Sequence, residues 1–534
     1  MRSAVVALAA VLASYGSALA LEHVAGLHLD IVIMAVVLAM TLARIQRTAG
    51  HADRLAAFAL VPGVAVLAWV TGHLMSAHAD IGDAAFVALM AASVWVRRFG
   101  PRVARAGLLI VSPLIAVLVI GQGGPGQAGP GWVMLVAVVA YGWVTVCQVL
   151  AERTGFTPGT QPPVMAGGAK HSTRRIAAST RMALQLGAAL AAAFAAGRLI
   201  WPTHWSWVVL TAYIVCSGAA GRGDVLLKGV LRMAGAAAGT LVAAGIAGAF
   251  GSRADVTVVI IFAALFLATW LREYSYAYWA GIVTAVLSLL YGWFGESPGV
   301  LLDTRLAGIA LGAALGIVAS WLILPVRTGD VLRRRSADAL TALGGLLAAD
   351  RTDAAALHAG QTGFEQSLGQ LARIAQPLRA QRLLFARWRP ASATGANAID
   401  AIAGCAGPVR VLAGGVSDRA SDGASDRASD RASDRASDGA SDDAIEGVGD
   451  GASVVRDDDP VDVTARAVAR NVVAVRLAIG RRPGLGYRAV LAVPDGPAGA
   501  ALGQLDRALG VLATAFAPVP ARRRGGAGRT RRRR

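Results

Sequence analysis

The sequence predicts an all-α, polytopic membrane protein with about twelve transmembrane helices, arranged as two parallel six-helix repeats, and a helical cytoplasmic C-terminal region. Three observations predict this class. Of the 534 residues, 55% are hydrophobic and only 16% are charged, whereas about a quarter of the residues in a soluble domain are charged. The apolar residues gather in long stretches that end near Pro325. The basic residues, which give a net charge of +18, fall mainly between these stretches or in the last dozen positions.

The apolar stretches have the length of membrane-spanning helices. A bilayer core about 30 Å thick needs about 20 mostly apolar residues per helix, because hydrocarbon offers no partners to exposed backbone groups. Twelve stretches qualify, several of them short, and they lie near residues 4–21, 30–43, 55–73, 82–96, 106–121, 131–150, 182–199, 205–220, 233–250, 255–271, 277–294 and 306–324.

The basic residues predict the orientation of these spans. With the N-terminus inside, seventeen Lys and Arg residues fall in cytoplasmic connections and three fall outside. The inner set is Arg2, Arg44, Arg47, Arg54, Arg97, Arg98, Arg102, Arg105, Arg153, Lys170, Arg174, Arg175, Arg181, Arg222, Lys228, Arg232 and Arg272, and the outer set is Arg198, Arg253 and Arg305. Positive charge concentrates on the cytoplasmic side of membrane proteins. The sequence therefore predicts a multi-pass protein of the plasma (bacterial inner) membrane with both termini in the cytoplasm.

The first span has two interpretations. Arg2 followed by an Ala-rich run that ends Ser-Ala-Leu-Ala at residue 20 is also typical of a cleaved signal peptide. We favour a retained helix, because an internal repeat gives this span a counterpart.

The repeat rests on matched residues in two halves, residues 1–150 and 182–325, which are joined by a cytoplasmic linker at 151–181. At a shift of 175, Asp80, Trp95, Arg97 and Arg47 match Asp255, Trp270, Arg272 and Arg222, and slightly larger shifts pair His28 with His204 and Arg54 with Arg232. Coincidence in an Ala-rich sequence is the alternative. Because six is even, both halves would insert in the same orientation, and a pathway would lie between them.

Four stretches of the second half carry a family resemblance. They are Trp205-Ser-Trp-Val-Val-Leu-Thr211, Lys228-Gly-Val-Leu-Arg232-Met-Ala-Gly235 continuing to Gly239-Thr240, Tyr278-Trp-Ala-Gly-Ile-Val-Thr284, and Asp303-Thr-Arg305-Leu-Ala-Gly308 running to Pro325. In this order, residues 182–325 resemble the fusaric acid resistance and aromatic acid exporter (FUSC-like) family. The resemblance implies a six-helix membrane module that exports small aromatic carboxylic acids, coupled to the proton gradient, and plant relatives that resemble malate-type anion channels. The first half lacks the Arg-x-x-Gly-x-x-x-Gly run after Arg54.

The candidate substrate-binding residues come from these motifs and are Arg232, Arg305, Trp207, Thr211, Tyr278 and Thr284. The two arginines open predicted helices, where free N–H groups and a guanidinium together hold a carboxylate. Trp207 is a candidate for stacking on the aromatic ring of a substrate. For Trp207 and for the two arginines, the alternative role is anchoring at the membrane edge. The threonine hydroxyls either contact substrate or bond to the preceding helical turn.

The predicted spans contain no charged residue near their midplanes, where such residues usually mark a route for ions. Proton coupling would then depend on His28, His204 or acids at helix ends, all of which are equally interpretable as interfacial residues. The favoured function is export of organic acids. The alternatives are a passive organic-anion channel, which the missing midplane carboxylate favours, and a non-transporting envelope scaffold.

Enzymatic activity is not predicted. The sequence has no nucleophile with a matching base, no metal cluster and no nucleotide loop, so we expect neither a metal nor a cofactor. Its three cysteines, Cys147, Cys216 and Cys405, are too far apart for a CxxC metal clip. The expected partner is a small organic anion, and a periplasmic adaptor and a homo-oligomer stay open as further partners.

The C-terminal third is predicted to be cytoplasmic. Residues 326–416 and 445–521 carry leucines at helical spacing and predict an amphipathic bundle, with Pro377 expected to kink or end one helix. Between them, residues 417–444 repeat Ser-Asp-x-Ala, which predicts a disordered linker. The tail, 522–534, holds eight arginines. We expect it to contact membrane lipids rather than nucleic acid, because no groove-reading element accompanies it.

Overall fold

The fold is known from a computed structural model, which describes residues 1–27, 30–47, 50–120, 129–156, 177–219, 221–250, 255–272, 276–293, 298–325, 328–350, 353–385, 390–414, 459–482, 484 and 486–516. Within these residues the protein has seventeen α-helices, one short 3-10 helix and no strand, which confirms the all-α prediction. The chain divides into two compact units, Met1–Thr328 and Gly329–Arg534.

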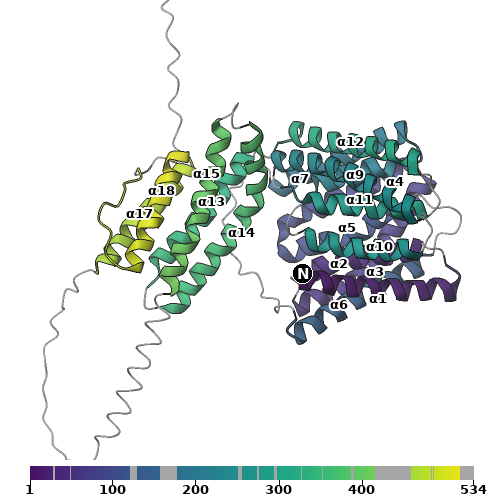
Figure 1. Cartoon of the computed structure of the whole chain (residues 1–534), viewed down its shortest axis with the longest axis horizontal. Coiled ribbons are helices and arrows are strands. Elements are labelled where there is room, and N and C mark those ends of the chain that lie inside the picture. The colour runs from purple at the N-terminus through teal and green to yellow at the C-terminus, as the bar shows by residue number, and fades with distance from the viewer. Residues whose placement is uncertain are drawn as a thin grey trace, which may run out of the picture. The chain divides into compact units, whose positions relative to one another are not determined.

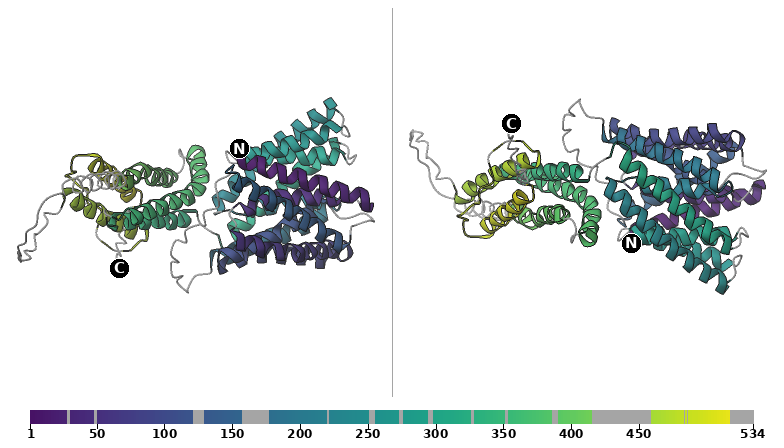
Figure 2. Two further views of the ribbon diagram at one scale, coloured as in Figure 1. Left: turned by 90° about the horizontal axis from the view of Figure 1, so that it is seen from below. Right: turned by 90° about the horizontal axis from the view of Figure 1, so that it is seen from above.

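The first unit consists of twelve α-helices that share one general direction (Figure 1). They are α1 (Arg2–Ala25), α2 (Asp30–Gln46), α3 (His51–Ala77), α4 (Ala79–Trp95), α5 (Pro101–Ile120), α6 (Pro130–Arg153), α7 (Ala178–Ile200), α8 (Trp205–Cys216), α9 (Arg222–Phe250), α10 (Asp255–Leu271), α11 (Tyr276–Trp293) and α12 (Pro298–Leu322), with the 3-10 helix η1 (Val96–Phe99) after α4. Each of the twelve overlaps one predicted span. The helices share this direction also in Figure 2, which shows the molecule from below and from above.

Eight of the described helices are long and apolar enough to cross a membrane: α1, α3, α4, α5, α6, α7, α9 and α12. The other four, α2, α8, α10 and α11, are apolar but shorter. This composition and these lengths are those of a multi-pass membrane protein. The count of twelve crossings stays a prediction.

Six pairs of packed helices in the first set have a counterpart in the second, whereas the contacts of α2 with α5 and of α3 with α4 have no comparable counterpart among the described residues. In the first set α1 packs on α2 and α6, α2 on α6, α3 on α5 and α6, and α4 on α5. In the second set α7 packs on α8 and α12, α8 on α12, α9 on α11 and α12, and α10 on α11. Between the sets α4 packs on α7 and α10 packs on α1, which is again a shift of six helices. The duplication of a six-helix repeat stays a prediction, and this packing is interpreted in its terms.

Glycines let the helices of the second set approach closely. A Cβ added at Gly239 on α9 would overlap the carbonyl oxygen of Gly281 on α11, and one at Gly312 on α12 would overlap the carbonyl of Val208 on α8. Small residues at such faces allow packing by van der Waals contact between backbones. The glycine spacing in the sequence therefore serves helix packing.

Two helices begin earlier than the sequence predicts, and this corrects the setting of two arginines. α9 begins at Arg222 and α12 at Pro298, so Arg232 and Arg305 lie inside their helices instead of opening them. A polar segment can continue a helix even though its hydropathy is low. In the polar first turns of α9, an ion pair of 3.3 Å between Lys228 and Asp224 spans one helical turn. Helix N-termini therefore do not supply carboxylate-binding groups at these two positions.

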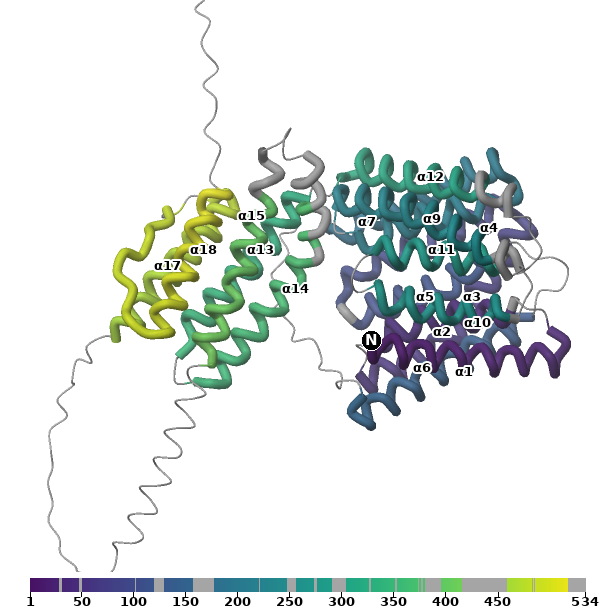
Figure 3. The backbone as a smooth tube through the Cα atoms, viewed as in Figure 1, coloured from purple at the N-terminus to yellow at the C-terminus, as the bar shows by residue number. Residues whose placement is uncertain are grey.

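The second unit contains α13 (Thr328–Ala348), α14 (Ala354–Phe385), α15 (Pro390–Gly404), α17 (Pro460–Ile479) and α18 (Pro497–Phe516) (Figure 3). Helix α15 packs on α14 and α18, and α17 packs on α18. Leucines at the predicted helical spacing are buried, including Leu340, Leu343, Leu505 and Leu509. Helix α14 continues through Pro377, so this residue does not end the helix, and the alternative of a kink at this position stays a prediction. The Ser-Asp-x-Ala repeat and the basic tail lie outside the described residues.

Candidate functional site

A cavity of about 1140 Å³ lies inside the first unit, between helices of the two sets. Its lining comes from α1, α2 and α5 of the first set and from α8, α9, α10 and α11 of the second. Sites for small molecules usually measure roughly 300–1000 Å³. The cavity is therefore large enough for an organic ligand and occupies the place where a pathway between the halves was predicted.

One end of the cavity is strongly cationic. Seven basic residues line it, namely Arg44, Arg47, Arg97, Arg105, Lys228, Arg232 and Arg272, and Glu22 is the one carboxylate among the described lining residues. The basic residues come from the end of α2, from η1, from the early turns of α5 and α9, and from the residue after α10. Glu22 lies near the end of α1, far along that helix from Arg2. The cavity thus has one cationic end, which the predicted topology assigns to the cytoplasmic side.

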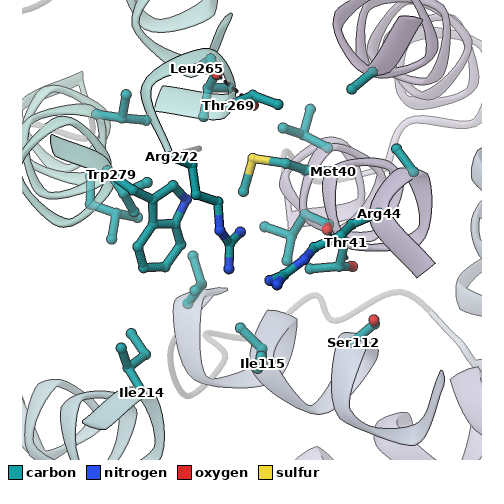
Figure 4. Close-up of a pocket in the computed structure, with 18 of the residues that line it drawn as sticks. Met40, Thr41, Arg44, Ser112, Ile115, Ile214, Leu265, Thr269, Arg272 and Trp279 are labelled. Carbon is teal, nitrogen blue, oxygen red and sulfur yellow. Dashed lines mark hydrogen bonds between the residues drawn. The ribbon is translucent and has the colours of Figure 1, made fainter. Parts of the chain in front are cut away.

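Arg44 and Arg272 extend toward each other across this end (Figure 4). The charge of Arg272 interacts with those of Arg44 and Arg47, and its guanidinium lies 4.6 Å from the ring centroid of Trp279. Like charges in apolar surroundings repel one another more strongly than they do in water. An anion between these arginines would relieve the repulsion.

Arg232 and Tyr276 present hydrogen-bond donors that no described residue accepts. The Arg232 side chain is fully buried, and its Nη1 donates to the carbonyl oxygen of Ala280 (3.3 Å) and to Oγ1 of Thr284 (3.1 Å). Its Nε and Nη2 atoms and the buried hydroxyl of Tyr276 have no partner among the described residues. Arg232 and Tyr276 both line the cavity and interact electrostatically. Since buried polar groups are normally hydrogen-bonded, these donors mark a place for a carboxylate.

The arginine that the sequence aligns with Arg232 is paired within the protein. Arg54 on α3 donates from Nη1 to Oε2 of Glu152 on α6 (3.1 Å) and from Nη2 to Oε1, and its carbonyl oxygen accepts from the Tyr141 hydroxyl (2.7 Å). Among the described residues no carboxylate pairs with Arg232. The first set therefore neutralises its buried arginine, whereas the second set leaves the corresponding charge buried beside the cavity with no carboxylate partner among the described residues.

Of the six substrate-binding candidates, Arg232 is the one that lines the cavity. Arg305 is buried between helices, where Nη1 donates to Oγ of Ser288 (2.5 Å) and Nη2 to the carbonyl of Thr284 (3.1 Å), and its guanidinium lies 4.1 Å from the ring centroid of Trp207. This contact joins α12 to α11 and α8. Thr211 is buried against Gly312 of α12.

The remaining candidates lie away from the cavity or outside the described residues. Tyr278 is 55% exposed. His204 directly precedes α8, and its Nδ1 shares a hydrogen bond of 2.8 Å with Oγ1 of Thr203. His28 lies outside the described residues. The structure therefore does not bring His204 to the cavity.

Sequence reasoning missed most of the cavity lining, including Arg44, Tyr213, Arg272, Tyr276 and Trp279. One signal was present, because Arg97 and Arg272 match at the shift of 175 residues. Both arginines line the cavity, and both interact electrostatically with the phenol of Tyr213.

Apolar helices packed around a cationic cavity define a membrane protein of the transporter class. The comparisons agree with this class, because residues 186–319, within the second set of helices, match the model of the family described as fusaric acid resistance protein-like. Members of the family are membrane transporters rather than enzymes. The matched segment includes Arg232, Arg272, Tyr276 and Trp279. No curated protein matches the chain.

Proposed function

We propose that this protein exports small organic acids, aromatic carboxylic acids among them, across the plasma membrane, and that the cavity is the binding site. The observation that carries the proposal is the set of unaccepted donors on Arg232 and Tyr276 at the cationic end of an otherwise apolar cavity. The match to the fusaric acid resistance protein-like family supports the same class of cargo.

Each part of an aromatic acid finds a complementary group in this cavity. The carboxylate accepts hydrogen bonds from Nε and Nη2 of Arg232 and from the Tyr276 hydroxyl, as in other charge-assisted pairs. Arg272 and Arg44 add positive potential at the same end. The aromatic ring packs against Trp279 and the aliphatic lining beyond it.

The membrane potential favours outward movement of such an anion. In the predicted orientation the cationic end faces the cytoplasm and collects anions from it. A potential that is negative inside contributes roughly 2.3 kcal/mol per charge per 100 mV toward the outside. Export of a monovalent acid therefore does not require a second driving ion.

A passive organic-anion channel is the second candidate function. It is favoured by the lining itself, because Glu22 is the one carboxylate and no histidine is found among the described lining residues. Proton coupling, as the family resemblance implies, would have to use Glu22 or a residue outside the described ranges.

The proposal is tested by measuring accumulation of radiolabelled benzoate in cells that lack the protein and in cells that express it. We expect lower accumulation with the wild type, and accumulation as in the deletion strain for Arg232→Gln and Arg272→Gln at equal membrane abundance. Arg222→Gln is the matched control, because Arg222 stacks on Trp321 (5.2 Å) and does not line the cavity. Equal accumulation with and without the wild-type protein would contradict the proposal.

Collapse of the proton gradient at constant membrane potential separates a proton-coupled exporter from a channel or a carrier that the membrane potential alone drives. It abolishes uphill export by a proton-coupled exporter and leaves downhill anion flux through a channel unchanged. A scaffold protein shows no flux under either condition.

A further inference from the structure

The cavity is elongated along the helices. Its lining extends over fifteen or sixteen residues along each of five helices, from Ala7 to Glu22, from Val32 to Arg47, from Arg105 to Val119, from Val258 to Arg272 and from Tyr276 to Leu290. At 1.5 Å per residue, each of these stretches is roughly 21 Å long. The cavity thus reaches through about two thirds of a bilayer core about 30 Å thick.

The walls change character along this length. The basic residues lie at one end, and most of the lining beyond them is aliphatic, as at Val36, Val119, Ile261, Val286 and Leu290. Hydroxyl groups such as those of Thr41 and Tyr15 interrupt this surface, and the Glu22 carboxylate lies at the end of α1 away from the basic residues. The cavity is therefore a long apolar slot with a single cationic end.

A compact aromatic acid fills only part of such a slot. With its carboxylate at Arg232, the ring of benzoate reaches Trp279 and the first aliphatic residues. The far part of the wall, at Ile261 on α10 and Leu290 on α11, stays without a contact. Unfilled apolar space forfeits the dispersion contacts and the desolvation that a filled cavity gains. A ligand with an extended apolar tail contacts the whole slot.

We propose that the slot binds long-chain carboxylates, with the carboxylate at Arg232 and Tyr276 and the alkyl chain along the aliphatic walls. This inference rests on the proposed function, because both assign the anion to the same cationic end. The inference differs from the proposed function in the property of the ligand that determines affinity. That property is the length of the apolar chain.

The test is equilibrium dialysis of radiolabelled carboxylates against the full-length protein in nanodiscs, with empty nanodiscs subtracted and the free aqueous concentration measured. The probes are benzoate and the saturated acids from butanoate to eicosanoate. Burial of one methylene contributes about 0.8 kcal/mol, which is about a fourfold gain in affinity. We expect gains approaching this size for each added methylene, levelling off once the chain exceeds the slot.

A bulky side chain in the slot gives a second, independent readout. Ile261 lies on α10, eleven residues before Arg272, and is thus roughly 16 Å from the cationic end at 1.5 Å per residue. The variant Ile261→Trp places a bulky side chain at this point. We expect it to remove at least tenfold of the affinity for hexadecanoate and to leave benzoate binding within twofold. Ile81→Trp is the control, because Ile81 is 59% exposed on α4 and does not line the cavity.

The outcomes separate this inference from the proposed function. Benzoate binding without any dependence on chain length overturns the inference and leaves the proposed function standing. Chain-length dependence without benzoate binding supports the inference and removes aromatic acids as cargo. If no carboxylate binds, both are overturned. If Ile261→Trp does not fold, the wild-type chain-length series decides alone.

Discussion

We expect opposite changes in stability from two substitutions. Glu152→Ala breaks the ion pair of Arg54, and Arg232→Met removes the buried charge of Arg232. Arg54 is nearly fully buried and ion-paired with Glu152, which is 24% exposed. Removal of one partner of a buried pair leaves an uncompensated charge and costs roughly 3–5 kcal/mol. We expect Glu152→Ala to lower the free energy of unfolding by about 3 kcal/mol, at the lower end of this range because Glu152 is partly solvated.

Arg232→Met removes a buried charge for which the described residues offer no carboxylate. It loses two hydrogen bonds to neutral acceptors, each worth about 1 kcal/mol, and removes two buried nitrogens without partners, each of which costs about 1–3 kcal/mol. The Thr284 hydroxyl keeps its own bond to the carbonyl of Ala280 (2.7 Å). We therefore expect the ligand-free variant to be as stable as the wild type or more stable by up to about 4 kcal/mol.

The assay is unfolding of the purified protein with and without benzoate. At a ligand concentration of a hundred times Kd, the wild type gains about 2.7 kcal/mol, and Arg232→Met is expected to gain nothing. If the ligand-free Arg232→Met protein lost as much stability as Glu152→Ala, Arg232 would be a structural cation satisfied by the protein, and the argument for a carboxylate site would be refuted.

Three further predictions concern packing and titration. Gly239→Ala should destabilise the first unit by several kcal/mol, because its Cβ would overlap the backbone of Gly281, and normal thermal stability of this variant would contradict the close helix contact. Burial raises the pKa of the Cys405 thiol to about 12, so in a variant without the other two cysteines we expect maleimide labelling at neutral pH only after unfolding, and rapid labelling of the folded protein would refute this. Partial burial, followed by a hydrogen bond to Asp506 and the charge of that carboxylate, raises the pKa of Tyr487 to about 12. A phenol with a raised pKa stabilises the fold below its ordinary value near 10 and loses this contribution as the pH rises toward 12. Absorbance of tyrosinate, with Tyr487→Phe subtracted, should show this late titration, and Asp506→Asn should shift it to lower pH.

The helices of the membrane unit follow from local sequence patterns. Each predicted span overlaps one helix, because apolar length is the dominant requirement for a segment in a bilayer. Helix starts were less accurate, since α9 and α12 extend through charged residues that hydropathy excludes. The placement of Arg232 and Arg305 inside helices could therefore not be predicted from hydropathy alone.

The candidate site was predictable only in part. Arg232 was identified from its motif, whereas Arg44, Arg272 and Tyr276 line the same cavity because helices distant in the sequence pack together. Arg305 carries the same kind of motif signal, yet its guanidinium joins α12 to α11 and Trp207. A motif identifies a constrained residue without saying whether a ligand or a neighbouring helix imposes the constraint.

The central claim, an anion pathway through the cationic cavity, is tested most directly by flux through the purified protein in liposomes. We measure release of trapped radiolabelled benzoate for wild type, Arg232→Met and Arg222→Gln at equal incorporation. The account predicts release by the wild type and by Arg222→Gln, and loss of release in Arg232→Met. Wild-type liposomes that retain benzoate as well as protein-free liposomes do, or an Arg232→Met protein that releases it at the wild-type rate, would contradict the claim.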